Sequence, residues 1–226
     1  MIGVFDSGIG GLAAINELRK ISKTVDVCFL ADRENAPYGT KTLEEITGYA
    51  KRNIAKLTSL GAEKILIACC TASVTYPRLS KGEMEASLPI IDLSARRAVE
   101  LSANGRIGVI ATERTVKEKA FAKAVSKFSK SAAVFELEAQ NFVSLVENGE
   151  RDGNLTLEAK LKIEKTLERL FDKKIDTLIL GFTHFSHIEE EIRRILGTKT
   201  VNPALEGARE IIQHTNLSGD GRTIYV

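Results

Sequence analysis

The chain of 226 residues is 43% hydrophobic and 27% charged, with a formal net charge of +2, which is an ordinary composition for a globular protein. So small a net charge excludes a strongly basic nucleic-acid-binding protein, and no apolar run approaches the roughly 20 residues that a membrane span needs. The three cysteines, two of them adjacent, match neither a disulfide framework nor a zinc site and predict a reducing, cytoplasmic setting. We therefore expect no metal, no nucleic-acid partner and no membrane partner.

Short apolar runs alternate with amphipathic helical patterns along the whole chain. Strands are predicted at IGVF, VDVCFLAD, KILIACC, PIIDL, RIGVIA, AAVFELEA, DTLILG and TKTVN. Several of these runs are continuously apolar, as expected of strands that are buried on both faces of a parallel sheet. The alternation predicts an α/β protein built from right-handed βαβ units.

Apolar residues at helical spacing predict the helices between these strands. Two stripes define the first helices: Leu12, Ile15, Leu18 and Ile21, and then Leu43, Ile46, Ala50, Ile54 and Leu57. Thr42 with Glu45, and Thr115 with Glu118, each have the spacing of a capping box at a helix start. A long helix rich in Leu, Glu and Lys is predicted over about residues 156–172.

The sequence contains a weak internal repeat at about half the chain length. IGVFDSGIGG resembles IGVIATERT, and KILIACCTAS resembles DTLILGFTHF. Such a period predicts two similar α/β domains, with an active-site cleft between them where the carboxyl ends of the parallel strands meet. The expected boundaries are residues 1–92 with 204–226 for a discontinuous first domain, and residues 93–203 for the second.

The loop FDSGIGGL follows the first predicted strand and carries Asp6 and Ser7 at the strand end. Its glycines allow a ligand to approach the backbone N–H groups closely. A tight turn capped by Asp6 or Ser7 is the simpler alternative. Gly8, Gly10 and Ala13, followed about 20 residues later by Asp32, also match a dinucleotide-binding fingerprint. The first glycine of that fingerprint should follow the strand directly, whereas Asp6 and Ser7 intervene here. A dinucleotide-dependent oxidoreductase is therefore the least favoured alternative.

Two further loops carry residues suited to chemistry. Pro37 and Gly39 form a turn on which Tyr38 is placed to line a cleft, although a bare turn is the favoured explanation of this loop taken alone. Cys69 and Cys70 end a strand just before a helix, where the helix dipole is expected to lower a thiol pKa. The alternative is that both cysteines are small buried core residues, as we expect for Cys28.

The segment LGFTHF has the same strand-to-helix arrangement as the cysteine loop. Thr183 and His184 match Thr71 and Ala72, and Phe182 falls at the cysteine position. A histidine in such a place is equally explained as a helix cap.

Taken together, the four loops resemble the glutamate racemase family of the aspartate/glutamate racemase superfamily. The family pattern reads D-S-G-x-G-G, P-Y-G, A-C-N-T-A and L-G-C-T-H-Y. The corresponding segments here are DSGIGG at 6–11, PYG at 37–39, ACCTA at 68–72 and LGFTHF at 180–185. IGVIATERT and FVSLVENG also resemble family segments, so the likeness covers nearly the whole chain in order.

The resemblance implies a cofactor-independent enzyme that inverts the Cα of glutamate and supplies D-glutamate for peptidoglycan. In the family, two cysteines on opposite sides of the substrate each transfer a proton. By resemblance Cys69 is one of them, assisted by Asp6, while Glu147 and His184 assist the opposite thiol. The implied substrate-binding residues are Asp6, Ser7, Pro37, Tyr38, Gly39, Cys70, Thr71, Thr183 and His184.

Two positions depart from the family pattern. Cys70 replaces a substrate-contacting asparagine, and Phe182 replaces the second catalytic cysteine. A phenyl ring carries no transferable proton, and Cys70 lies beside Cys69 in the same loop, so efficient two-thiol racemisation is not expected. The expected ligand is glutamate or a similar acidic amino acid.

Three alternatives stay open for the activity. His184 replaces the missing thiol, or Cys69 acts alone in exchange, elimination or decarboxylation, or the protein is a binding or regulatory homologue. The sequence therefore does not decide whether the protein is an enzyme, and it leaves a homodimer open.

Overall fold

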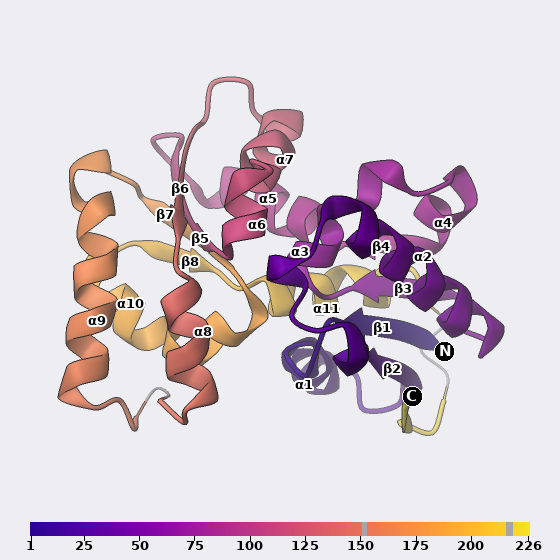
Figure 1. The fold of residues 1–226 in the computed structure, drawn as a ribbon. Helices are drawn as coiled ribbons and strands as arrows, with labels where there is room; N and C mark the ends of the chain where they lie inside the picture. The colour runs from indigo at the N-terminus through magenta and orange to yellow at the C-terminus, as the bar shows by residue number, and fades with distance from the viewer. Residues whose placement is uncertain (151–152, 216–218) are drawn as a thin grey trace. The chain divides into compact units, whose positions relative to one another are not determined.

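The computed structural model describes residues 1–150, 153–215 and 219–226, without the side chains of Val143, Glu147, Thr183 and His184. The chain divides into two compact units, which are described separately. Unit 1 comprises Met1–Leu93 and Pro203–Val226, and unit 2 comprises Ser94–Asn202. Figure 1 shows the elements of both units, with both chain ends in unit 1. Within the described residues no helix is long and apolar enough to cross a membrane.

Unit 1 is built on a five-stranded parallel sheet with the strand order β4-β3-β1-β2-β9. The strands are β1 (Ile2–Asp6), β2 (Val27–Ala31), β3 (Lys64–Ile67), β4 (Ser87–Pro89) and β9 (Thr223–Tyr225). β1 is buried along its whole length, as its continuous apolar run predicts. The adjacency of β1 and β3 places their two following loops at one edge of this sheet.

Helices cover both faces of this sheet. They are α1 (Leu12–Ile21), η1 (Arg33–Asn35), η2 (Tyr38–Thr40), α2 (Leu43–Ser59), α3 (Cys70–Ser73), η3 (Tyr76–Arg78), α4 (Lys81–Ala86) and α11 (Pro203–Gln213). In Figure 1, α1 and α2 lie on opposite sides of β1 and β2, and α11 packs beside α1. Gly207 of α11 lies so near the sheet that a Cβ there would stand 2.9 Å from a methyl group of Leu66.

The second predicted helix stripe is confirmed in α2. Ile46, Ala50, Ile54 and Leu57 are all buried against the sheet. The predicted capping box is also confirmed, because the Thr42 hydroxyl accepts from the Glu45 N–H at 3.2 Å and the Glu45 carboxylate accepts from the Thr42 N–H at 2.8 Å. In the first stripe Ile15 and Leu18 are buried, whereas Ile21 at the helix end is exposed.

The predicted strand PIIDL is wrong for all but its first residue. Pro89 ends β4, and Ile90 begins the helix α5 (Ile90–Leu101), in which Ile90 and Ile91 are buried. A short apolar run has the same appearance in a buried strand and at a buried helix start, so periodicity does not separate the two. Strand β9 has no counterpart among the predicted strands.

Unit 2 contains a four-stranded parallel sheet with the order β6-β5-β7-β8. The strands are β5 (Arg106–Ala111), β6 (Ala133–Glu138), β7 (Thr177–Gly181) and β8 (Lys199–Val201). Read from β8 to β6, this order repeats the order β4-β3-β1-β2 of unit 1. The prediction of two similar α/β domains with parallel sheets is therefore confirmed.

The helices of unit 2 pack around this sheet. They are α6 (Glu113–Lys117), α7 (Ala120–Phe128), α8 (Gln140–Glu147), α9 (Leu157–Leu167), η4 (Glu168–Lys173), η5 (Thr183–Ile188) and α10 (Glu189–Leu196). The helix predicted over 156–172 is thus α9 followed by the 3-10 turns of η4. Buried residues of α8, α9 and α10 share one apolar core with β7, and Phe142, Ile163, Leu180 and Ile192 belong to it.

The capping box predicted at Thr115 and Glu118 is wrong. Helix α6 begins earlier, with Thr112 as its N-cap, so Thr115 lies inside the helix and Glu118 is its C-cap. The physical reason is that β5 ends at Ala111 and the chain turns into the helix immediately.

Candidate active site

Cys69 lies two residues after the end of β3, as the N-cap residue of α3. Its sulfur accepts a hydrogen bond from the Ala72 N–H at 3.4 Å and lies 3.4 Å from the hydroxyl oxygen of Ser7. The side chain is only 2% exposed. The structure therefore holds this thiol in one position, between a loop hydroxyl and a backbone amide.

Asp6 and Ser7 reach the cysteine because β1 and β3 are neighbours in the sheet. Asp6 ends β1, and its carboxylate accepts from the Gly8 N–H at 2.8 Å, which ties the first turn of the loop to the strand end. Asp6 is 4% exposed. Two segments 62 residues apart in sequence thus contribute a carboxylate, a hydroxyl and a thiol to one buried group.

The Cys69 pKa is raised, which corrects the prediction of a lowered thiol pKa. Burial raises this pKa most, and the charge of Asp6 raises it further, to about 11. The hydrogen bonds from Ser7 and Ala72 lower the pKa and only partly oppose these two effects. Helix α3 has four residues, so few peptide dipoles align behind the sulfur. The thiol is accordingly protonated at neutral pH.

The same burial acts on Asp6. It raises the pKa of this carboxyl from 3.8 to about 6, against the hydrogen bonds from Gly8 and Ser7, which lower it. A carboxyl with a pKa near neutrality is able both to hold and to release a proton under working conditions.

Cys70 and Thr71 follow Cys69 and are buried, with 1% and 2% of their surfaces exposed. Burial, followed by the charges of Cys69 and Asp6, raises the pKa of Cys70 well above its ordinary value.

Tyr38 is also buried, with 1% of its surface exposed, at the start of η2 after the cis Ala36–Pro37 peptide. Its hydroxyl donates to an Asp32 carboxylate oxygen at 2.5 Å. The Asn53 amide of α2 donates to the same carboxylate oxygen and to the Tyr38 hydroxyl oxygen, both at 3.2 Å. These three side chains fasten the turn that contains Pro37 and Gly39 to the end of β2 and to α2.

Every partner of the Asp32 carboxylate thus helps to hold the fold together. Asn35 donates to its other oxygen at 2.6 Å, and the Arg52 guanidinium lies 3.6 Å away. Although burial acts to raise its pKa, the hydrogen bonds from Tyr38, Asn35 and Asn53, together with the Arg52 charge, leave the pKa below its ordinary value. A carboxylate so engaged offers no free oxygen for a ribose hydroxyl, which argues against the dinucleotide alternative.

Asn53 was not among the predicted site residues. A signal was present, because Asn53 lies next to Ile54 on a helix whose buried face is otherwise apolar. A buried amide requires hydrogen-bond partners. That requirement predicts a polar group opposite α2 but does not identify it as Tyr38 and Asp32.

Removing the Tyr38 hydroxyl is expected to destabilise unit 1. Tyr38→Phe deprives the buried Asp32 carboxylate of its shortest hydrogen bond, and bonds to charged groups contribute about 1.5–3 kcal/mol. The free energy of unfolding from urea titration measures the loss. Tyr76→Phe is the matched control, because the Tyr76 hydroxyl donates to the neutral Met84 carbonyl at 3.0 Å, a bond of about 0.5–1.5 kcal/mol. A loss for Tyr38→Phe no larger than for Tyr76→Phe would contradict the role given to Asp32.

In unit 2, Phe182 directly follows β7 with an extended backbone. Its ring lies 5.4 Å from the Phe185 ring, centroid to centroid, and Phe185 in turn lies 5.6 Å from Phe142. The phenyl group thus packs on the apolar core of unit 2. The side chains of Thr183, His184 and Glu147, which the sequence places in the site, lie outside the described residues.

Unit 2 has a pair of buried threonines after β5, and Thr112 occupies the place that Ser7 occupies in unit 1. Thr112 and Thr115 follow β5, are buried, and have their hydroxyl oxygens 3.0 Å apart. Strands β5 and β7 are neighbours, so this pair and Phe182 follow adjacent strand ends. The repeat of IGVFDSGIGG in IGVIATERT was the available signal for these two residues.

Gly181 shows how tightly the end of β7 is packed. A Cβ at this position would stand 2.7 Å from the Ile110 carbonyl oxygen and 2.8 Å from the Phe121 ring. Only glycine fits there without a shift of the backbone, which holds the start of the 182–184 segment against β5.

Comparison with known proteins identifies the family of this chain. Residues 12–211 match the model of the Asp/Glu/Hydantoin racemase family. A glutamate racemase of Desulforudis audaxviator is 42% identical over 201 residues, which cover 88% of this chain and 72% of that protein. The crystal structures of a Bacillus anthracis glutamate racemase isoform and of a Francisella tularensis glutamate racemase in complex with D-glutamate each superpose with a TM-score of 0.88 at 28% identity. These alignments cover 100% and 99% of this chain, and 86% of each of the other chains.

The chain therefore belongs to the Asp/Glu/Hydantoin racemase family, as a protein of its glutamate racemase branch.

Proposed function

We propose that the protein binds glutamate or a similar acidic amino acid and transfers a proton at its Cα with Cys69 as the thiol carrier. The observation that carries the proposal is the buried group in which the Cys69 sulfur lies 3.4 Å from the Ser7 hydroxyl, at the strand end next to Asp6. Family membership and the D-glutamate complex of the Francisella tularensis relative support the ligand class. No cofactor takes part in the proposed reaction.

The residues of unit 1 have distinct parts in this reaction. Asp6, with a pKa of about 6, accepts the thiol proton, and the Ser7 hydroxyl and Ala72 N–H stabilise the resulting thiolate. The substrate ammonium adds a positive charge, which favours the thiolate over the protonated thiol. The thiolate then removes the α-proton and returns a proton to the same face. In the proposal, substrate contacts come from Ser7, Thr71, Cys70 and the 37–39 turn.

Position 182 decides the stereochemical outcome. In the two-thiol reaction to which the resemblance points, the second proton carrier comes from this position, and here it is Phe182. The phenyl ring has no proton to give, so the expected reaction is α-proton exchange with retention of configuration. Thr183, His184 and Glu147 keep the roles implied by the resemblance, with His184 as the alternative second acid.

A second candidate function is favoured by one observation. With a pKa of about 11, the Cys69 thiol is protonated at neutral pH in the absence of ligand. If glutamate does not draw the proton away, the protein binds the amino acid without transforming it. In this case the protein is a binding or regulatory homologue, which retains the residues around Cys69 and does not turn the amino acid over.

By family, the process served is the supply of D-glutamate for peptidoglycan, in the cytoplasm. We include this role, and a homodimer, in the proposal. Both follow from kinship alone.

Loss of the Cys69 thiol is expected to slow the exchange of the glutamate α-proton strongly. Proton NMR of L- and D-glutamate in D₂O follows the Cα–H signal, and Cys69→Ala should slow its loss by about 10²–10⁴-fold, the usual contribution of a positioned acid or base. Cys28→Ala is the matched control, because Cys28 is an equally buried thiol on β2. Equal rates in the two variants would rule out Cys69 as the carrier. Glutamate binding to the unmodified protein with no exchange would establish the second candidate.

A further inference from the structure

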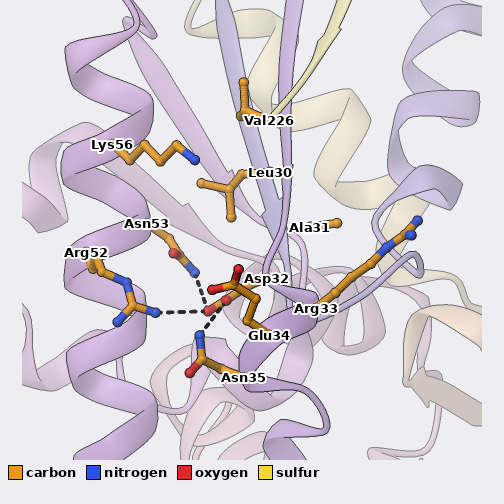
Figure 2. A pocket seen from close by; sticks show the side chains of 10 residues that line it. All are labelled: Leu30, Ala31, Asp32, Arg33, Glu34, Asn35, Arg52, Asn53, Lys56 and Val226. Atoms are coloured by element: carbon orange, nitrogen blue, oxygen red, sulfur yellow. Dashed lines mark hydrogen bonds and ion pairs between the residues drawn. The ribbon is translucent and has the colours of Figure 1, made fainter.

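Unit 1 contains a cavity of about 570 Å³ that the proposed reaction does not use. It lies beside the end of β2, between the turn η1 and the outer side of α2, and Figure 2 shows its lining. Its volume falls within the range of about 300–1,000 Å³ that is typical of small-molecule sites. Tyr38, Ser7 and Cys69 are absent from its lining.

The α2 wall of this cavity is cationic. Arg52 and Lys56 lie one helical turn apart, and both are exposed. Like charges at this spacing repel each other, and no acidic residue stands three or four positions from either of them on α2. In the part of the chain that the structure describes, the Lys56 ammonium makes no hydrogen bond or ion pair, so it is available to a ligand.

The acids of the cavity offset part of this positive charge. Asp32 is 8% exposed and is already held by Tyr38, Asn35 and Asn53, with Arg52 3.6 Å away. Glu34 is the other acidic side chain in the lining, and it has Arg33 next to it. The three basic side chains of the lining, Arg33, Arg52 and Lys56, outnumber the two acidic ones by one, so the lining has a net positive charge.

The cavity also has an apolar part. Leu30 and Val226 line the end beside Lys56, and Arg52 lies toward the opposite end in Figure 2. A ligand that suits this lining carries an anionic group for Arg52 and Lys56 and an apolar or aromatic body for Leu30 and Val226. Phosphate suits this pair, because arginine binds it through a planar guanidinium and lysine binds it as a point charge.

We propose that this cavity binds a phosphate group, through Arg52 and Lys56. The source is either a free phosphate ion or a phosphate ester whose body occupies the apolar end. The site is separate from the Cys69 group, so the proposal does not depend on the proposed function.

Calorimetric titration of the whole chain with ADP, inorganic phosphate and adenosine, at constant ionic strength, tests the proposal. We expect saturable binding of ADP and none of adenosine. Weaker binding of inorganic phosphate than of ADP assigns the site to a phosphate ester, and equal binding assigns it to the free ion. Absence of binding by both ADP and phosphate at millimolar concentrations would overturn the proposal.

Charge-removing variants locate the site. Arg52→Gln and Lys56→Gln are each expected to weaken ADP or phosphate binding by about two- to fivefold, the range for exposed ion pairs, and the double variant by about tenfold or more. Lys51→Gln is the matched control, because Lys51 is an exposed base on the same helix outside the cavity lining. Circular dichroism verifies that each variant is folded. Binding by the folded double variant that equals that of Lys51→Gln would place the anion elsewhere and refute the assignment.

Discussion

Phe182→Cys is expected to gain racemisation of glutamate, by about 10²–10⁴-fold over the unmodified protein. The substitution restores a proton carrier at the position where the family pattern has its second cysteine. It leaves Cys69, Asp6 and Ser7 unchanged. Optical rotation of L-glutamate, followed to racemic equilibrium, measures the gain.

Phe182→Ala is the control for this substitution. It removes the same phenyl ring, which lies 5.4 Å from the Phe185 ring, centroid to centroid, and it supplies no thiol. Both variants should lose a similar stability, of about 1–3 kcal/mol for a partly buried aromatic ring. Racemisation in both variants would show that the bulk of Phe182, and not the missing thiol, blocks the reaction.

Racemisation in neither variant would shift attention to Cys70, which stands at the family's asparagine position. The double variant Phe182→Cys with Cys70→Asn then tests whether both departures must be reversed. Failure of this variant, although it is folded, would contradict the view that two residues account for the change in activity.

Asp6→Asn is expected to remove a pH-dependent cost of folding. Burial raises the Asp6 pKa from 3.8 to about 6, so the folded state holds its proton more tightly than the unfolded state. The stability of the unmodified protein therefore decreases as the pH rises from about 4 to about 6, and the whole cost, about 3 kcal/mol, is present above pH 6. The asparagine keeps an acceptor for the Gly8 N–H and does not ionise.

Urea unfolding at a series of pH values measures this effect. The stability of Asp6→Asn minus that of the unmodified protein should increase by about 2.4 kcal/mol between pH 4 and pH 7. Asp32→Asn is the contrasting control, because the Asp32 pKa lies below its ordinary value and both states are ionised above pH 5. Its stability difference should stay nearly constant from pH 5 to pH 7. A flat difference for Asp6→Asn would mean that its carboxylate is better solvated than the structure indicates.

The sheets were the most predictable part of this molecule. Continuous apolar runs fix β1, β3 and β7 as buried parallel strands, and the repeat in the sequence predicts that the two units share one topology. Sequence periodicity failed where a run is too short to show a period, as at Ile90 and Ile91. It also failed at Thr115, because the capping-box pattern recurs inside helices.

The electrostatics of the group formed by Asp6, Ser7 and Cys69 could not be predicted from the sequence. Asp6, Ser7 and Cys69 were named from the family resemblance, and they lie close together because β1 and β3 are neighbours in the sheet. The raised Cys69 pKa was not foreseeable, since it depends on how completely the surrounding chain excludes water. The hydrogen bond from Asn53 to the Tyr38 hydroxyl could not be predicted either, because it joins residues that the fold brings together.

The central claim is that Cys69 acts without a second thiol. The direct measurement is incubation of the unmodified protein with L-glutamate in D₂O, with the Cα–H signal and the optical rotation followed in the same sample. The account predicts loss of the Cα–H signal while the rotation is retained. Loss of both would contradict the account, because it would show that a second proton carrier replaces the thiol that is missing at position 182. His184 would be the first candidate, and His184→Asn would test it.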